Sequence, residues 1–224
     1  MLKNNVCAAS WYVEWMQSHL RKGFVGSMLA VLFAISMSSA IGCGKSDTSP
    51  TVEFAPVTKN GMTLTKVGNL YRATDGAFSI EFPGSQPPDF QELPSEIASS
   101  ILINSGVKGL TVTISVAAIT KEFSATEYDE LAAGMALPTF ESHKATPATE
   151  YGVLAGNRAL IARGRGIVAN AGSGEDRNKP LEISTWSVPL PAQRKVYFIS
   201  VMRSPTVAIA DVDRIINSVT MAKP

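Results

Sequence analysis

Apolar and polar residues alternate over residues 78–82 (FSIEF). Side chains of a β-strand point alternately to opposite faces, so this pattern predicts a strand whose three apolar side chains share a buried face. The Thr-Asp-Gly triplet at 74–76 supplies the positive backbone angles of a tight turn. Residues 69–72 are therefore expected to pair with this strand as a hairpin.

A second hairpin is predicted within residues 98–118. Its two apolar runs are separated by Asn104, Gly106 and Gly109, which are residues typical of turns. In the second run, residues 111–116 alternate threonine or serine with valine or isoleucine. This alternation predicts a strand with one buried and one solvated face.

Three further strand-like segments, 157–169, 181–188 and 195–202, follow one another in the second half of the chain. Their connections are too short for a crossover helix, so we expect an antiparallel meander. Residues 195–202 (KVYFISVM) are almost continuously apolar, which is typical of a central strand. The polar connection at 170–179 is expected to be a mobile hairpin tip, either a plain solvated turn or a surface that recognises a partner.

Two amphipathic helices complete the pattern. Residues 124–127 (SATE) have the form of a capping box, and apolar residues at helical spacing follow until Pro138. Ser204-Pro205 can start a last helix, in which Val212, Ile215, Ile216 and Val219 form one stripe. Together the elements predict an α+β domain with an antiparallel sheet packed between helices.

An export signal precedes this domain. Arg21 and Lys22 are followed by the apolar run 24–35, and the tail after it ends in Ala40-Ile41-Gly42-Cys43. That tetrapeptide resembles the lipobox of bacterial lipoproteins. The resemblance implies cleavage between Gly42 and Cys43 and attachment of lipid to the Cys43 sulfur.

The apolar run is shorter than the roughly 20 apolar residues of a stable membrane span, which favours a cleaved signal. An uncleaved single-span anchor is the alternative, and both place the rest of the chain outside the cytoplasm. The expected domains are a leader and signal at 1–42, a lipidated flexible tether at 43–61 and a globular domain at 62–224. Residues 1–15 fit no part of this scheme, so we expect translation to start at Met16 rather than Met1.

Charge and composition exclude several function classes. The chain has 20 basic and 19 acidic residues, which gives no electrostatic basis for binding nucleic acid. Of its two cysteines, Cys7 lies in the leader and Cys43 would be acylated. No thiol then remains for a metal, a disulfide or a nucleophile.

Candidate catalytic residues are few. His143 is the only histidine after the signal, and its polar surroundings (ESHKATP) predict a solvated side chain. A hydrolase using His143 is a distant alternative, because no Gly-x-Ser-x-Gly motif accompanies it. The acidic pairs fall on expected surface positions, so we expect no metal site, no cofactor and no enzymatic activity.

Two surface features admit a functional reading. Arg158, Arg163 and Arg165 recur at short intervals and could hold an anionic partner if they share one face of the sheet. Solvated charges opposite the core are the alternative. Gly164-Arg165-Gly166 lacks the spacing of a phosphate-binding loop and is expected to be a flexible strand end.

Residues 75–84 (DGAFSIEFPG) and 210–219 (ADVDRIINSV) resemble the domain of PsbP-like proteins. That fold is shared with a Ran-binding nuclear import factor and with mycobacterial envelope lipoproteins. The resemblance covers about 69–221 and implies an α/β/α sandwich, with relatives that include adaptors and assembly factors, and it carries over no catalytic residue.

The expected function is therefore a lipid-anchored, non-catalytic binding or scaffold protein of the bacterial cell envelope. It would face the periplasm or the exterior, with an envelope protein as its partner. The alternative is a carrier of a small apolar ligand with a pocket between sheet and helix. A cluster of apolar side chains lining an unfilled cavity would favour the carrier. A filled core with an exposed apolar patch would favour the binding or scaffold protein, that is, an adaptor.

Overall fold

The computed structural model describes residues 54–94, 98–168 and 178–222. The export signal, its cleavage site at Gly42 and Cys43, and most of the polar loop 170–179 lie outside the described residues. The sequence-based expectations for these segments therefore stay predictions.

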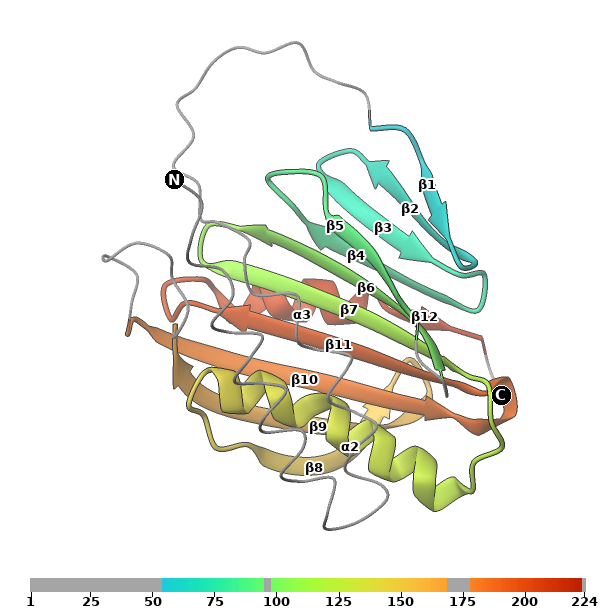
Figure 1. Ribbon diagram of the computed structural model, residues 1–224. Coiled ribbons are helices and arrows are strands. Elements are labelled where there is room, and N and C mark those ends of the chain that lie inside the picture. Colours follow the sequence, from blue (N-terminus) through green and yellow to red (C-terminus); the bar gives the residue numbers. More distant parts are fainter. Residues whose placement is uncertain (1–53, 95–97, 169–177, 223–224) are drawn as a thin grey trace, which may run out of the picture. The chain divides into compact units, whose positions relative to one another are not determined.

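The described chain forms two antiparallel sheets (Figure 1). The five-stranded sheet has the order β1 (Val57–Lys59), β2 (Met62–Val67), β3 (Leu70–Thr74), β4 (Phe78–Pro83) and β12 (Thr220–Met221). The seven-stranded sheet has the order β5 (Asp89–Pro94), β6 (Ala98–Val107), β7 (Leu110–Ile119), β11 (Lys195–Arg203), β10 (Pro180–Leu190), β9 (Asn157–Ile167) and β8 (Ala148–Leu154). The helices among the described residues are α2 (Ala125–Ser142), α3 (Ile209–Asn217) and the 3-10 turn η2 (Pro191–Gln193). The α+β class and the antiparallel pairing are confirmed.

The predicted hairpin at the start of the domain is present as β3 and β4. Phe78, Ile80 and Phe82 are all at most 1% exposed, and Asp75-Gly76 forms the turn, with φ +85° at Gly76. The Asp75 carboxylate accepts hydrogen bonds from the backbone N–H groups of Ala77 and Phe78. These bonds stabilise the turn, because they satisfy two backbone N–H groups that make no hydrogen bond between β3 and β4.

The folded domain begins earlier than the predicted boundary at Met62. Residues 57–59 of the expected tether form β1, which pairs with β2 through a turn at Asn60 and Gly61. Both turn residues have positive φ, as the tight turn between two strands requires. The strand is too short to show an apolar period, which is why the sequence suggested a tether.

The second predicted hairpin and the meander are both confirmed within the seven-stranded sheet. β6 and β7 are joined at Lys108 and Gly109, and β9, β10 and β11 follow one another as antiparallel neighbours. β11 occupies the fourth of the seven positions, as its apolar sequence predicts. The two edge strands, β5 and β8, were not predicted from the sequence.

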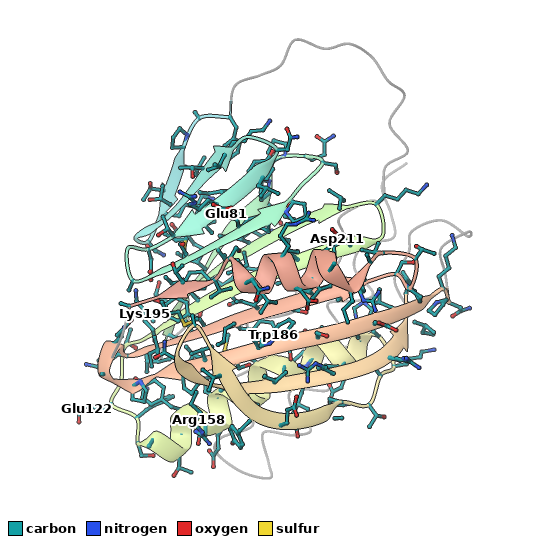
Figure 2. All side chains as sticks on the ribbon, turned by 180° about the vertical axis from the view of Figure 1, so that it is seen from behind. Glu81, Glu122, Arg158, Trp186, Lys195 and Asp211 are labelled. Carbon is teal, nitrogen blue, oxygen red and sulfur yellow. The ribbon has the colours of Figure 1, made fainter. Side chains whose placement is uncertain are left out.

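The two faces of the seven-stranded sheet have different covers (Figures 1 and 2). Helix α2 lies across β9, β10 and β11 on one face. The other face packs against the five-stranded sheet and α3 in one apolar core. The expectation of a single sheet between helices is thus corrected, because a second sheet takes up much of the face that α3 was expected to cover.

β7 is buried on both faces, contrary to the single buried face predicted from its alternation. Val112 and Ile114 point to the five-stranded sheet, and Thr113 and Ser115 on the opposite face are only 8% and 2% exposed. Threonine and serine side chains are small, and they can be buried in the protein interior when the hydroxyl finds a hydrogen-bond partner or the surrounding side chains pack closely around it. The polar residue types therefore gave a misleading signal of solvent exposure.

Both helices differ from the sequence prediction at one end. The capping box of Ser124 and Glu127 is present, but α2 continues past Pro138 to Ser142. The buried side chains of Thr139 and Phe140 favour this last turn despite the hydrogen bond that proline cannot donate. α3 begins at Ile209 instead of Ser204, because residues 204–207 form a turn bonded to the β6–β7 loop. Within the described residues, neither helix is both long and apolar enough to cross a membrane.

Candidate functional site

A groove of about 570 Å³ lies beside α3, where the two sheets meet. Three segments that are distant in the sequence line it: β3 and β4, the β6–β7 turn, and the chain from Thr206 to Ser218. The lining residues are Leu70, Glu81, Pro83, Val107, Lys108, Leu110, Thr206, Val207, Ala208, Asp211, Arg214, Ile215 and Ser218. This volume is within the range of small-molecule sites in proteins, about 300–1,000 Å³.

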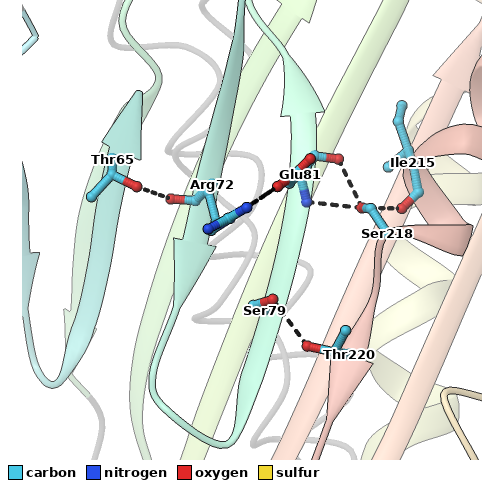
Figure 3. Close-up of polar contacts among 7 residues, drawn as sticks. All are labelled: Thr65, Arg72, Ser79, Glu81, Ile215, Ser218 and Thr220. Carbon is cyan, nitrogen blue, oxygen red and sulfur yellow. Dashed lines mark hydrogen bonds and ion pairs between the residues drawn. The ribbon is translucent and has the colours of Figure 1, made fainter. Parts of the chain in front are cut away.

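One wall of the groove is fixed by Ser218, the residue that follows α3 (Figure 3). Its hydroxyl accepts a hydrogen bond from the N–H of Glu81 at 2.9 Å. The same hydroxyl lies 2.6 Å from the carbonyl of Ile215 and 3.1 Å from that of Glu81, and it donates its single proton to these acceptors. A side chain of one residue thus joins the end of α3 to the backbone of β4.

The floor of the groove is apolar. Leu110 and Ile215 are both 3% exposed and belong to the main core. Val107 and Val207 are partly buried against that core. The Ser204 N–H donates to the Gly109 carbonyl at 2.7 Å, which holds the turn before α3 against the β6–β7 turn. An apolar chain or side chain entering the groove would therefore meet a preformed surface.

The rim of the groove carries charges of both signs. Glu81 forms an ion pair with Arg72 of the neighbouring strand (Figure 3), and Asp211 lies 3.4 Å from Arg214 one turn along α3. Among the described residues, Lys108 forms no ion pair, and it is exposed. The rim therefore has one cation without an internal partner above an apolar floor, so an anionic group of a ligand would be met most favourably at Lys108.

A second cluster of polar groups joins the two sheets. The Asp75 carboxylate, on the β3–β4 turn, accepts a hydrogen bond at 2.7 Å from the phenol of Tyr197 on β11. It also pairs with the ammonium of Lys195 at 2.5 Å. The Asp75 side chain is 5% exposed. A neighbouring cavity of about 40 Å³, lined by Asn60, Met62 and Ser99 among others, has space for a water molecule but not for a substrate.

The pKa values of this cluster oppose acid–base catalysis. Burial alone would raise the pKa of Asp75, but the hydrogen bonds from Lys195 and Tyr197 and the Lys195 charge outweigh it, so the pKa of Asp75 is lowered. Burial and the hydrogen bond to Asp75 raise the pKa of Tyr197 far above its ordinary value. Asp75 is thus held ionised and Tyr197 protonated, whereas a general acid or base needs a pKa near the working pH. The cluster is a connection between the sheets.

His143 is buried, which corrects the prediction that it is solvated. It follows the last residue of α2 and is 6% exposed. Its Nδ1 lies 2.8 Å from the Thr139 carbonyl and 3.0 Å from the Ser142 hydroxyl. The helix end, packed on β9, encloses the ring. The Ser142 hydroxyl beside the ring also donates to the Thr139 carbonyl at 3.0 Å, and no carboxylate is bonded to His143 among the described residues.

The three arginines of β9 do not form an anion site. Arg158 is on the α2 side of the sheet, where it binds both carboxylate oxygens of Asp129. Arg163 and Arg165 share the opposite face, and they pair with Glu150 and Glu182 respectively. Each arginine therefore has a carboxylate partner, and the three do not share one face, so the condition for a common site for an anionic partner is not met.

Gly164 and Gly166 are close-packing positions rather than a flexible strand end. Both lie inside β9 and pair with β10. A Cβ atom on Gly164 would stand 2.9 Å from the Phe140 ring and from the Thr146 carbonyl oxygen. A Cβ on Gly166 would stand 2.4 Å from the His143 carbonyl oxygen. Glycine is required here because the end of α2 lies directly on the strand.

The groove was not predicted as a set of residues. Its walls combine β3 and β4 with residues 206–218, and no local motif announces a contact between segments so far apart. Ile215 was correctly predicted to lie on the buried apolar stripe of the last helix. This stripe is the sequence signal that could have pointed to the groove. Among the described residues, no group of three or more histidine, cysteine, aspartate or glutamate side chains could hold a metal ion.

The chain is similar in structure to a solved protein of the mycobacterial cell envelope. No family model matches the chain, and no curated protein matches it. The crystal structure of LpqN, which is involved in cell envelope biogenesis of Mycobacterium tuberculosis, is similar with a TM-score of 0.40 and 13% sequence identity. The match covers 67% of this chain and 87% of LpqN.

Proposed function

We propose that this chain is a lipid-anchored, non-catalytic binding protein of the bacterial cell envelope, and that the groove beside α3 holds its binding partner. The observation that carries the proposal is the groove itself. It combines an apolar floor of core residues with a rim on which Lys108 is free to pair. A preformed, mostly apolar concavity with few polar groups is the usual form of a binding site.

The anchor and the absence of a catalytic arrangement in the described residues support the same assignment. The lipobox-like tetrapeptide ending at Cys43 implies a domain held at a membrane surface outside the cytoplasm, facing the periplasm or the exterior. Within the described domain, Asp75, Tyr197 and His143 are all engaged in structural contacts. The partner favoured by the sequence-based reading is another envelope protein, which would insert an apolar side chain between α3 and the β6–β7 turn.

A carrier of a small amphipathic molecule is the second candidate. The volume of about 570 Å³ favours it, because a site of this size can enclose much of a small ligand. The Lys108 ammonium at the rim would then face an anionic head group. The two candidates share one site and differ in the size of what occupies it.

A photo-reactive amino acid in place of Lys108 tests the site and separates the candidates. Irradiation of cells should give an adduct on the full-length chain. Lys121 is the matched control: it is exposed and follows β7, whereas the groove residue Leu110 begins that strand. Substitution at Lys121 should give no adduct.

Mass analysis of the Lys108 adduct decides between the candidates. An added protein-sized mass supports the envelope adaptor, and an added mass of a small molecule supports the carrier. Equal labelling at Lys108 and Lys121, or none at Lys108, would exclude the groove as the binding site.

A further inference from the structure

The two edges of the seven-stranded sheet differ in how they are protected. β5, at one edge, carries Asp89 and Glu92 and ends in Pro94, and such residues discourage pairing with another strand. β8, at the other edge, contains no proline and no lysine, and its single charged residue is Glu150. Figure 1 shows β8 outside β9 with no described strand beyond it.

The backbone of β8 presents a regular row of unpaired groups. β8 and β9 are joined by the two-residue turn Ala155-Gly156, so the flanking pair Leu154 and Asn157 exchanges hydrogen bonds. Inward and outward groups alternate from that pair. The N–H and C=O groups of Thr149, Tyr151 and Val153 therefore point away from the sheet.

The side chains at these outward positions are neutral and exposed. Tyr151 is 59% exposed and Val153 is 71% exposed, and Thr149 is also exposed. All three lie on the α2 side, as shown by the Arg158 guanidinium, which stands 3.9 Å above the Tyr151 ring and binds Asp129 of α2. Tyr151 is thus held in place as part of a rigid edge.

We propose that two copies of this chain pair through β8, antiparallel and centred on Tyr151, so that their sheets become one continuous sheet. In this register Tyr151 faces Tyr151 of the second copy, and Thr149 faces Val153. All three outward-facing residues then exchange backbone hydrogen bonds. Aromatic pairs and pairs of β-branched side chains are favourable across strands.

In this register β8 is complementary to its own copy, which favours a second copy as the occupant. The two-fold symmetry decides which residue of the second copy lies opposite each charge of β8. Like charges directly opposite each other are unfavourable. Glu150 would face Gly152 of the second copy, which has no side chain, and it is already paired with Arg163 of its own chain. Moving the centre to Gly152 would set Glu150 against Leu154 instead.

A cysteine at the centre gives a direct test in the full-length chain, purified from membranes in detergent. Tyr151→Cys would place two thiols on facing residues, about 5.5 Å apart between Cα atoms in a hydrogen-bonded pair, which is within disulfide range. Mild oxidation should give a species of twice the mass on a non-reducing gel. Val67→Cys, an exposed position on the other sheet, is the matched control and should give none. Equal cross-linking at both positions, or none at Tyr151→Cys, would overturn the proposal.

A charge-swap experiment tests whether the partner is a second copy in this register. Tyr151→Lys and Tyr151→Glu should each raise the dimer dissociation constant about tenfold or more, because like charges then face each other. Mixing the two variants should restore the dimer, measured as molar mass by light scattering. Circular dichroism on each variant checks that the monomer is folded. A monomeric wild-type chain, unchanged dimers in the single variants, or a mixture that stays monomeric would each contradict the proposal.

Discussion

The carboxylate of Asp75 and the phenol of Tyr197 are 2.7 Å apart, although they are 122 positions apart in the sequence and belong to different sheets. Lys195 adds an ion pair to the same carboxylate. The aromatic ring of Tyr197 also stacks on Phe78 with ring centres 4.7 Å apart. The β3–β4 hairpin of the five-stranded sheet is thus joined to the central strand of the other sheet by polar contacts of Asp75 and an apolar contact of Phe78.

Asp75→Ala should lower the free energy of unfolding by about 2–4 kcal/mol, because it leaves Tyr197 and two backbone N–H groups without their acceptor. Urea unfolding at neutral pH measures this loss. Asp89→Ala, at an exposed position on β5, is the control and should change stability by less than about 0.5 kcal/mol. Equal losses in both variants would show that the connection between the sheets contributes nothing specific.

Asp75 should also make stability pH-dependent on the acid side. Its pKa is lowered in the folded state, so its contribution is complete above the unfolded pKa of about 3.9 and is lost as the pH falls through the lower folded value. The stability difference between wild type and Asp75→Asn should therefore be constant from pH 7 to about 5 and shrink below about 4. Urea titrations at several pH values measure this difference, and a difference that does not shrink as the pH falls below about 4 would contradict the assignment.

Thr185→Val should stabilise the domain. The Thr185 side chain is fully buried on β10, and its hydroxyl has no hydrogen-bond partner in the described chain. Replacing it with a methyl group of similar size removes a desolvated polar group, which is worth about 1 kcal/mol. Thr113→Val is the matched control: its hydroxyl donates to Asn104 at 2.8 Å, so this change should cost about 1 kcal/mol. Thermal denaturation should order the melting temperatures as Thr185→Val, wild type, Thr113→Val.

Gly166→Ala should destabilise the domain by about 1–3 kcal/mol, because the new methyl group would overlap the His143 carbonyl oxygen and force α2 away from β9. The neighbouring change Arg165→Ala serves as the control, since the Arg165 side chain is 88% exposed. Chemical denaturation of both variants provides the comparison. A Gly166→Ala variant as stable as Arg165→Ala would mean that the contact between α2 and β9 is not close.

Cys43→Ala should abolish lipid attachment and, with it, cleavage of the signal, because the sulfur is the acceptor for the lipid. In the wild-type chain each buried methylene of an acyl chain adds about 0.8 kcal/mol to membrane binding, so high salt should not release the protein. Metabolic labelling with a fatty acid reports the modification. An unlabelled wild-type chain that salt extracts from membranes would exclude the lipoprotein reading.

Local patterns were sufficient for much of the fold. The alternation at 78–82, the capping box at Ser124 and the apolar segment 195–202 each correspond to an element of the structure. These signals depend only on neighbouring residues. They could not reveal β1, which is a three-residue strand, or β8, whose exposed side chains carry no alternation.

Features that depend on contacts between distant parts of the sequence could not be predicted from local patterns. His143 looked solvated because its neighbours in sequence are polar, yet the end of α2 and β9 enclose it. Gly164 and Gly166 looked flexible because nothing local shows that α2 passes over them. The groove depends on how α3 meets β3 and β4, which the sequence pattern does not specify.

The pairing of β12 with β4 has a consequence for how the protein reaches its folded state. Thr220 faces Ser79 across the sheet, and their hydroxyls are bonded over 141 positions of sequence. Contacts of this range slow folding, because the loop must close before the contact contributes any stability. A chain that crosses a membrane starting from its signal would expose β4 long before β12 arrives. If the chain is exported from its signal end, the edge of the first sheet beside β4 stays unpaired until the last residues of the domain have crossed the membrane.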